Sequence, residues 1–175
     1  GRIFVYDVMQ DLHIPEKVAF AMLKASARDN ARTPMQWDST IHAGFNSGTT
    51  PWQKVNPDYR KINAMEDISS EKSIYRFYQK LLALRKSEKT LIYGSTIEYY
   101  PDDRQVISYS RCYGDKRFLI VGNFSGVRAD FIMPGDFELD ELTIRMTNRD
   151  RTDAEVEEIM HMKPYEAILF EEHRR

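Results

Sequence analysis

Residues 107–121 read I-S-Y-S-R-C-Y-G-D-K-R-F-L-I-V. The first part alternates apolar and polar residues with a period of two, which is typical of a strand that buries one face. Tyr113-Gly114-Asp115 carries turn-forming residues, and residues 118–121 are apolar on both faces, as expected of a central strand. The stretch therefore predicts two short strands joined by a turn.

The strand pattern continues toward the carboxyl terminus. Residues 142–146 alternate apolar with polar side chains, and residues 165–170 read as a terminal strand rich in large side chains. Turn signals separate about seven short strands, a spacing typical of an antiparallel sandwich. We therefore predict an all-β antiparallel sandwich domain at residues 90–175. The charged stretches 148–158 and 171–175 are expected to be solvated surface.

Two helices are predicted before this domain. Pro15 suits a first helical position, and the apolar residues after it repeat at helical spacing, which predicts a short helix over 15–26. Ser69 or Ser70 can cap a second helix over about 70–87. The apolar stripe of this second helix consists of Ile74, Phe77, Tyr78, Leu81 and Leu82.

Between the two helices lies a long loop. Residues 27–64 show no period, and prolines and glycines interrupt every run. A connection this long is uncommon in a compact domain unless it is functional or disordered. Large apolar side chains argue against disorder, so we predict an ordered, functional loop. These side chains are Met35, Trp37, Phe45, Trp52 and Tyr59.

Composition excludes several classes of protein. Of the 175 residues, 42% are apolar and 30% are charged, as in an ordinary globular chain. The net charge of −2 gives no general attraction to nucleic acid or anionic lipid, and no apolar run is long enough to span a bilayer. We therefore expect no nucleic-acid partner and no membrane partner. The single Cys112 and the lack of a secretion signal favour a cytoplasmic location.

The residues by themselves suggest little chemistry. The 27 acidic residues include no recognisable catalytic pair, since most lie on a helix or in turns, where a solvated charge is the simpler explanation. His13, His42, His161 and His173 have no partner at ligand spacing, so no metal site is predicted. No motif indicates a cofactor. We expect neither a catalytic residue nor a cofactor in this chain.

One segment of the loop resembles a known family. Residues 27–38 read A-R-D-N-A-R-T-P-M-Q-W-D, and they closely resemble the segment S-R-D-N-A-R-T-P-M-Q-W-D of oligo-1,6-glucosidases. The resemblance continues in order through Ala43-Gly44-Phe45, Pro51-Trp52, Val55-Asn56-Pro57-Asp58-Tyr59, Ile62-Asn63, residues 81–86 and Tyr93-Gly94. The chain thus resembles the oligo-1,6-glucosidase and α-glucosidase branch of the α-amylase superfamily, tightly over 26–94 and more loosely beyond.

This resemblance implies a fold and an activity. Family members are (β/α)8 barrels, and their nucleophile, acid/base and stabilising carboxylates lie at the ends of middle barrel strands, which would precede Gly1. Residues 1–89 would be the terminal part of the catalytic barrel, and its last loop and helix would lead into the sandwich. The predicted class is α+β. The implied function is the carboxyl-terminal part of a retaining exo-α-glucosidase that cleaves α-1,6 or, alternatively, α-1,4 bonds of oligosaccharides. The chain alone is expected to be inactive.

The resemblance also implies one substrate-binding residue. Arg28 matches the family arginine that, with an aspartate from an early barrel loop, binds the terminal glucose at its 4-hydroxyl. A planar guanidinium held by a carboxylate can donate to a free hydroxyl and block a further sugar. The alternative is a structural arginine that pairs with Asp29 or with a carbonyl oxygen of the loop. Trp37 and Trp52 could stack on sugars, but packing within the loop is their expected role.

Other functions stay open at this point. The chain could be a carbohydrate-binding sandwich module without catalysis. Within the family, a trehalose-6-phosphate hydrolase or a sucrose isomerase is an alternative, because the barrel residues that select the substrate are missing. The expected partners are a glucosyl oligosaccharide and the missing barrel portion. If the sandwich only covers the flank of a barrel, the stripe at 74–82 would be exposed in this chain and self-association would be expected.

Overall fold

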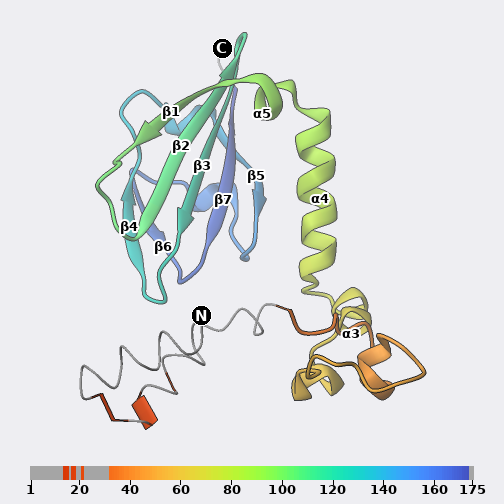
Figure 1. The fold of residues 1–175 in the computed structure, drawn as a ribbon. Helices are drawn as coiled ribbons and strands as arrows, with labels where there is room; N and C mark the ends of the chain where they lie inside the picture. The colour runs from red at the N-terminus through yellow and green to blue at the C-terminus, as the bar shows by residue number, and fades with distance from the viewer. Residues whose placement is uncertain (1–13, 16, 19–20, 22–31, 174–175) are drawn as a thin grey trace. The chain divides into compact units, whose positions relative to one another are not determined.

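The computed structural model describes residues 14–15, 17–18, 21 and 32–173 (Figure 1). The chain divides into two compact units, Gly1–Tyr75 and Arg76–Arg175. The helix predicted over 15–26 lies largely outside the described residues. The two units are therefore considered separately, beginning with the second.

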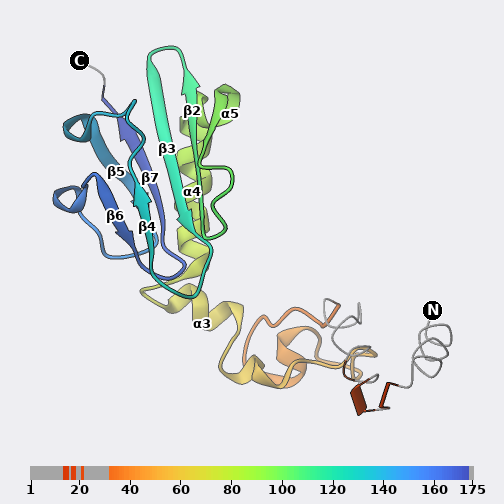
Figure 2. The same cartoon turned by 90° about the vertical axis from the view of Figure 1, so that its left-hand side faces the viewer.

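The second unit contains an antiparallel β-sandwich. Its larger sheet has the strand order β1-β2-β3-β7-β5, and its smaller sheet pairs β4 with β6 (Figure 2). The strands are β1 (Ser95–Tyr99), β2 (Val106–Tyr113), β3 (Lys116–Asn123), β4 (Ala129–Ile132), β5 (Leu142–Thr147), β6 (Ile159–Met162) and β7 (Ala167–Glu172). Short 3-10 turns, η4 (Leu139–Glu141) and η5 (Asp153–Glu155), flank β5. The prediction of about seven antiparallel strands is confirmed.

The core of the sandwich lies between the two sheets. The central strand β3 contributes Leu119 and Val121 to this core, and the alternation of a strand turns Ile120 to the opposite face. The smaller sheet contributes Phe131 and Met160. The remaining buried members are Val106, Ala129, Met133, Phe137, Leu142, Met162, Ile168 and Phe170.

Strand β2 buries the face that its sequence pattern marks as polar. It pairs with β3 along its whole length, as predicted, but Ser108 and Ser110 point into the core and are 1% and 0% exposed, whereas Ile107 is 49% exposed. The buried hydroxyls are satisfied, because Ser108 Oγ donates to the Tyr99 carbonyl oxygen at 3.0 Å and Ser110 Oγ lies 3.3 Å from the Tyr99 hydroxyl. Val106 therefore shares the core face with these serines, and Ile107 and Tyr109 lie on the outer face of the larger sheet.

Helices α4 (Ile74–Ser87) and α5 (Lys89–Tyr93) lead into β1. Helix α4 lies on the side of the larger sheet opposite β4 and β6, and α5, which the sequence did not predict, follows it (Figure 1). The predicted helix start near residue 70 is wrong by four residues. Asp67 explains the later start, because its carboxylate accepts the N–H groups of Ile74 and Tyr75 at 3.0 and 2.9 Å. No helix among the described residues has the length and apolar character needed to cross a membrane.

Several charges predicted to be solvated are buried. Arg151 and Glu166 form an ion pair whose side chains are 6% and 0% exposed. Arg117 pairs with Glu172 at the far end of β7, and the Arg117 guanidinium stacks 3.5 Å from the centre of the Phe137 ring. The expectation that 148–158 and 171–175 are only solvated surface is therefore wrong at Arg151 and Glu172. Burial is tolerated at these positions because each charge meets an opposite charge.

Candidate functional site

The predicted substrate-binding residue belongs to the long loop. Arg28 and Asp29 lie outside the described residues, and the described part of the predicted loop begins at Arg32. Arg32 and Thr33 are exposed and Pro34 is buried. The geometry of residues 32–64 therefore shows how the segment that follows Arg28 is held.

Backbone hydrogen bonds join the beginning of this loop to its end. The carbonyl oxygen of Gln36 accepts the N–H of Ala64 at 2.9 Å, and the carbonyl oxygen of Trp37 accepts the N–H of Met65 at 3.0 Å. The Gln36 amide also donates to the Ile62 carbonyl oxygen. These contacts close the loop at the start of α3 (Ala64–Ser69), so its two ends are fixed to one another. The prediction of an ordered loop is confirmed for residues 32–64.

A tight turn follows the closure. Asp38 Oδ1 accepts the backbone N–H of Thr40 at 2.8 Å and the Thr40 hydroxyl. These hydrogen bonds lower the pKa of Asp38 below its ordinary value, and the bond from the Thr40 hydroxyl has the larger effect. The carboxylate is therefore ionised at neutral pH. The Trp37 N–H donates to the Ala43 carbonyl oxygen at 2.8 Å and closes the turn.

The turn η2 (Ile41–Gly44) holds three successive residues in the left-handed region. The φ angles of His42, Ala43 and Gly44 are 55°, 60° and 66°. Two of these residues carry a Cβ, for which this region is unfavourable, and Ala43 is fully buried. Backbone strain of this kind persists only where the surroundings fix it, and it is concentrated at functional sites. The turn is therefore a rigid feature of the loop.

Substituting Gly44 by Ala is expected to destabilise this turn. A Cβ at Gly44 would lie 2.6 Å from the Asp38 carboxylate, and the φ of +66° disfavours any side chain. We expect a loss of about 1–3 kcal/mol in local stability, which corresponds to a roughly 5- to 150-fold faster proteolytic cleavage within 36–64. Gly48→Ala is the matched control, since a Cβ there meets nothing within 4 Å. Equal cleavage rates for the two variants would contradict this account of the turn.

The second half of the loop is held by asparagine caps. Asn56 accepts the Asp58 N–H at 3.1 Å and starts η3 (Pro57–Arg60). Asn63, which is buried, accepts the Glu66 N–H at 2.9 Å and donates to the Tyr59 carbonyl oxygen at 2.8 Å. Asn63 therefore caps α3 and ties it to the preceding turn. The spacing of Asn63 and Glu66 is a helix-start signal that sequence reasoning could have used.

The tryptophans of the loop are exposed. Trp37 is 52% exposed and Trp52 is 90% exposed, so the packing expected of them does not occur within the described part of the chain. The physical reason is a lack of apolar volume, because only Pro34, Ala43 and Asn63 are buried between residues 32 and 64. The loop thus presents aromatic surface on a fixed backbone, as a sugar site or a contact with another domain requires.

The described residues include several His, Cys, Asp and Glu side chains. No cluster of three or more His, Cys, Asp or Glu within them is arranged to hold a metal ion. The acidic groups at the two ends of the loop bind backbone N–H groups, Asp38 in its own turn and Asp67 at the start of α4. Cys112 is half-buried in β2. What the described loop offers chemically is a rigid backbone with exposed aromatic side chains.

Comparisons with known proteins agree with this arrangement. The family model of the α-amylase catalytic domain matches residues 6–94. The oligo-1,6-glucosidase of Halalkalibacterium halodurans is 40% identical over 157 residues, covering 90% of this chain and 28% of that enzyme. The crystal structure of Bacillus licheniformis trehalose-6-phosphate hydrolase has a TM-score of 0.87 at 31% identity, covering 99% of this chain and 31% of that one. Isomaltulose synthase from Klebsiella sp. LX3 has a TM-score of 0.82 at 28% identity, over 97% of this chain and 30% of that one.

The matches define how much of such a protein is present. The chain spans about three tenths of the length of these relatives. The matched family model ends at Gly94, one residue before β1 begins. The loop therefore falls within the catalytic-domain match and the sandwich follows it. On this evidence the chain belongs to the α-amylase family, in the branch that contains the oligo-1,6-glucosidases.

Proposed function

We propose that this chain forms the carboxyl-terminal part of a retaining exo-α-glucosidase that hydrolyses α-1,6-glucosidic bonds of oligosaccharides. Residues 1–89 would complete the catalytic barrel and residues 90–175 would form the sandwich behind it. The observation that carries the proposal is the 40% identity to an oligo-1,6-glucosidase over 90% of the chain. The carboxylates that cleave the bond would be supplied by the barrel portion, so the chain alone should be inactive.

Arg28 would define the closed end of the glucose site. It lies four residues before Arg32 in the sequence, and the described part of the loop begins at Arg32. A guanidinium can donate to the 4-hydroxyl of a terminal glucose and leave no room for another sugar. The strained turn at 42–44 and the joined loop ends would keep this arginine in place.

A chimera with a related enzyme tests the proposal. The 157 residues of the Halalkalibacterium halodurans oligo-1,6-glucosidase that match this chain would be replaced by the matching residues of this chain. We expect the chimera to hydrolyse isomaltose, since the loop and the sandwich would restore a complete barrel. The measurement is glucose release at several isomaltose concentrations, which gives kcat and KM.

Two controls make the chimera decisive. The host enzyme with the same residues deleted should be inactive, and so should this chain alone. A folded chimera that releases no glucose would reject the proposal. The binding-module alternative is tested on the chain alone by calorimetry with isomaltose and dextran, and saturable binding there would favour that alternative.

A trehalose-6-phosphate hydrolase is the second candidate. The observation in its favour is the TM-score of 0.87 to the Bacillus licheniformis enzyme, although the identity is 31% against 40% for the oligo-1,6-glucosidase. The same chimera built on that hydrolase separates the two candidates. For each chimera, kcat/KM is compared with that of its unmodified host. The chimera that keeps the larger share indicates which host has the barrel more similar to the native partner of this chain. A chimera on the isomaltulose synthase tests sucrose isomerisation in the same way.

The remaining proposals concern location and partners. We propose a cytoplasmic location, supported by the single cysteine of the sequence. The net charge of −2 supports the absence of nucleic-acid and anionic-lipid partners. Ile74, Tyr78 and Leu82 of α4 are 69%, 59% and 52% exposed. This exposed stripe supports docking against the barrel portion and, when that portion is absent, self-association.

A further inference from the structure

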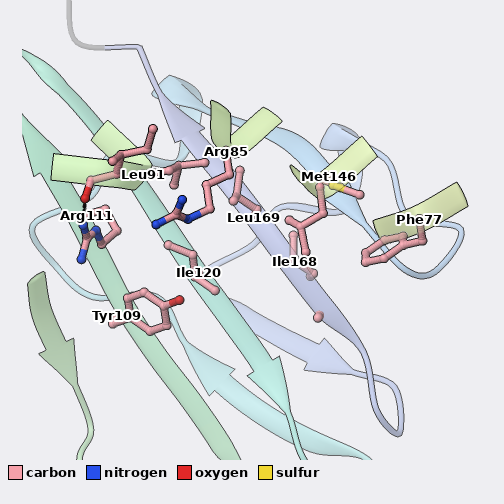
Figure 3. Close-up of a pocket in the computed structure, with 12 residues that line it drawn as sticks. Phe77, Arg85, Leu91, Tyr109, Arg111, Ile120, Met146, Ile168 and Leu169 are labelled. Carbon is pink, nitrogen blue, oxygen red and sulfur yellow. Dashed lines mark hydrogen bonds between the residues drawn. The ribbon is translucent and has the colours of Figure 1, made fainter. Parts of the chain in front are cut away.

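A pocket lies in the second unit, between α4, α5 and the outer face of the larger sheet. Its volume is about 610 Å³, within the range of roughly 300–1,000 Å³ that is typical of small-molecule sites (Figure 3). Leu81 of α4 lines it together with Ile120 and Leu169 of the sheet, and most of the lining is apolar. This is the face to which β2 turns Ile107 and Tyr109, so the pocket follows from the orientation of that strand.

Two arginines give the pocket a positive end. Figure 3 shows Arg85 of α4 and Arg111 of β2 toward one end, with Phe77 toward the other. Arg111 donates to the Thr96 hydroxyl at 2.8 Å and to the Ile92 carbonyl oxygen at 3.2 Å, which are both uncharged partners. Its Nε is buried and has no hydrogen-bond partner.

These positive charges are not neutralised within the second unit. The ion pairs formed by the described residues include neither Arg85 nor Arg111. Two guanidinium groups without an ion-pair partner beside an apolar wall favour a ligand with an apolar body and a negative end. A neutral apolar ligand would leave the charges unpaired, and a purely ionic ligand would leave the apolar wall in water.

We propose that this pocket binds a small amphipathic carboxylate, that is, an apolar chain that ends in one negative charge. The apolar chain would lie against Leu81, Ile120 and Leu169, and the carboxylate would lie between Arg85 and Arg111. This site is separate from the sugar site proposed around Arg28. Its occupation requires neither the barrel portion nor an active enzyme.

Octanoate and 1-octanol are the probes, because they share an eight-carbon chain and differ in charge. Calorimetric titration of the 175-residue chain should show saturable binding of octanoate with one site per chain. Octanol should bind about tenfold or more weakly, the difference expected for loss of one charge-assisted hydrogen bond. Circular dichroism of each sample checks that the chain is folded.

Variants of the two arginines test which residues bind the negative charge of the ligand. Arg85→Gln and Arg111→Gln should each weaken octanoate binding by about tenfold and leave octanol binding unchanged. Arg128→Gln is the matched control, since Arg128 lies in the turn before β4 and does not line the pocket. Arg111 also donates hydrogen bonds to β1 and α5, so Arg111→Gln could fail to fold. Arg85 is exposed and makes neither of these hydrogen bonds, so Arg85→Gln keeps the test valid in that case.

Three results would overturn the proposal. The first is a folded chain that shows no saturable octanoate binding. The second is equal affinity for octanoate and octanol, which would mean an apolar gap without charge selection. The third is an octanoate affinity that Arg85→Gln leaves unchanged. None of these results bears on the chimera experiment, so the proposed function and this site are tested independently.

Discussion

Replacement of Arg151 by Met is expected to destabilise the sandwich by about 3–5 kcal/mol, the usual cost of removing one partner from a buried ion pair. Arg151 Nε lies 2.8 Å from Glu166 Oε1, and Nη2 lies 3.0 Å from Oε2. The Glu166 side chain is 0% exposed, so water cannot replace the guanidinium. The measurement is the free energy of unfolding from urea titrations of the wild type and the variant.

Two further variants test the reason for this loss. Arg128→Met removes an exposed arginine and should change the free energy of unfolding by less than about 0.5 kcal/mol. The double variant Arg151→Met with Glu166→Met replaces both charges by apolar groups, so it should recover much of the stability lost in the single variant. If Arg151→Met unfolds at the same urea concentration as Arg128→Met, the pair does not stabilise the sandwich.

The same pair predicts how stability depends on pH. Burial raises the pKa of Glu166, but the hydrogen bonds from Arg151 and from the Lys163 N–H outweigh it, so the pKa lies below its ordinary value near 4.5. A depressed pKa in the folded state means that the stabilisation is present above about pH 4.5 and is lost as the pH falls through the folded value. The stability difference between wild type and Arg151→Met should therefore shrink below pH 4.5. A difference that is constant over this range would contradict the assignment.

The strands illustrate what a sequence pattern can predict. The period of two at 107–110 correctly predicts β2, and the apolar run 118–121 correctly predicts a central strand. The pattern does not reveal that Ser108 and Ser110 are the buried residues. A period reports that two faces differ, whereas burial depends on what covers each face. Here Tyr99 satisfies the buried hydroxyls, a contact between strands that no local pattern encodes.

Long-range contacts explain the other errors. Arg151 and Glu166 are fifteen residues apart, and charge counts along the chain cannot distinguish such a buried pair from solvated surface. The start of α4 is set by Asp67, which lies seven residues before Ile74, whereas the serines at 69 and 70 match the usual capping position. In both cases a side chain acts on a distant part of the chain, and the local preference is overridden.

The sequence predicts that an ordered loop is present, but it does not predict the backbone geometry of that loop. Its prolines, glycines and aromatic side chains indicate an ordered, irregular segment, and the structure confirms this for 32–64. Gly44 is the only member of the left-handed triplet whose residue type favours that conformation. His42 and Ala43 adopt it because the Trp37 to Ala43 hydrogen bond and the buried position of Ala43 require it. Tertiary context alone determines such residues.

Substitution of Arg28 by Ala in the active chimera is expected to lower kcat/KM for isomaltose by about 30- to 1,000-fold. This range corresponds to about 2–4 kcal/mol of transition-state stabilisation, as expected when a charge-assisted bond is removed from a desolvated pocket. Arg28→Lys should recover only part of the activity, because an ammonium group cannot reproduce the planar fork. Arg32→Ala is the control for a nearby arginine of the same loop, and it should retain activity within about threefold if Arg32 only supports the loop.

A structural role for Arg28 would give a different result. If Arg28 merely pairs with Asp29, the alanine variant should lower the stability of the chimera and reduce its activity on short and long substrates in equal proportion. If Arg28 closes the end of the glucose pocket, its removal opens space for another sugar. The ratio of activity on internal bonds of dextran to activity on isomaltose should then rise, while the melting temperature stays near that of the unsubstituted chimera. An unchanged ratio together with a lowered melting temperature would assign Arg28 to the structure of the loop, because only a residue at the end of the sugar site can exclude a longer chain.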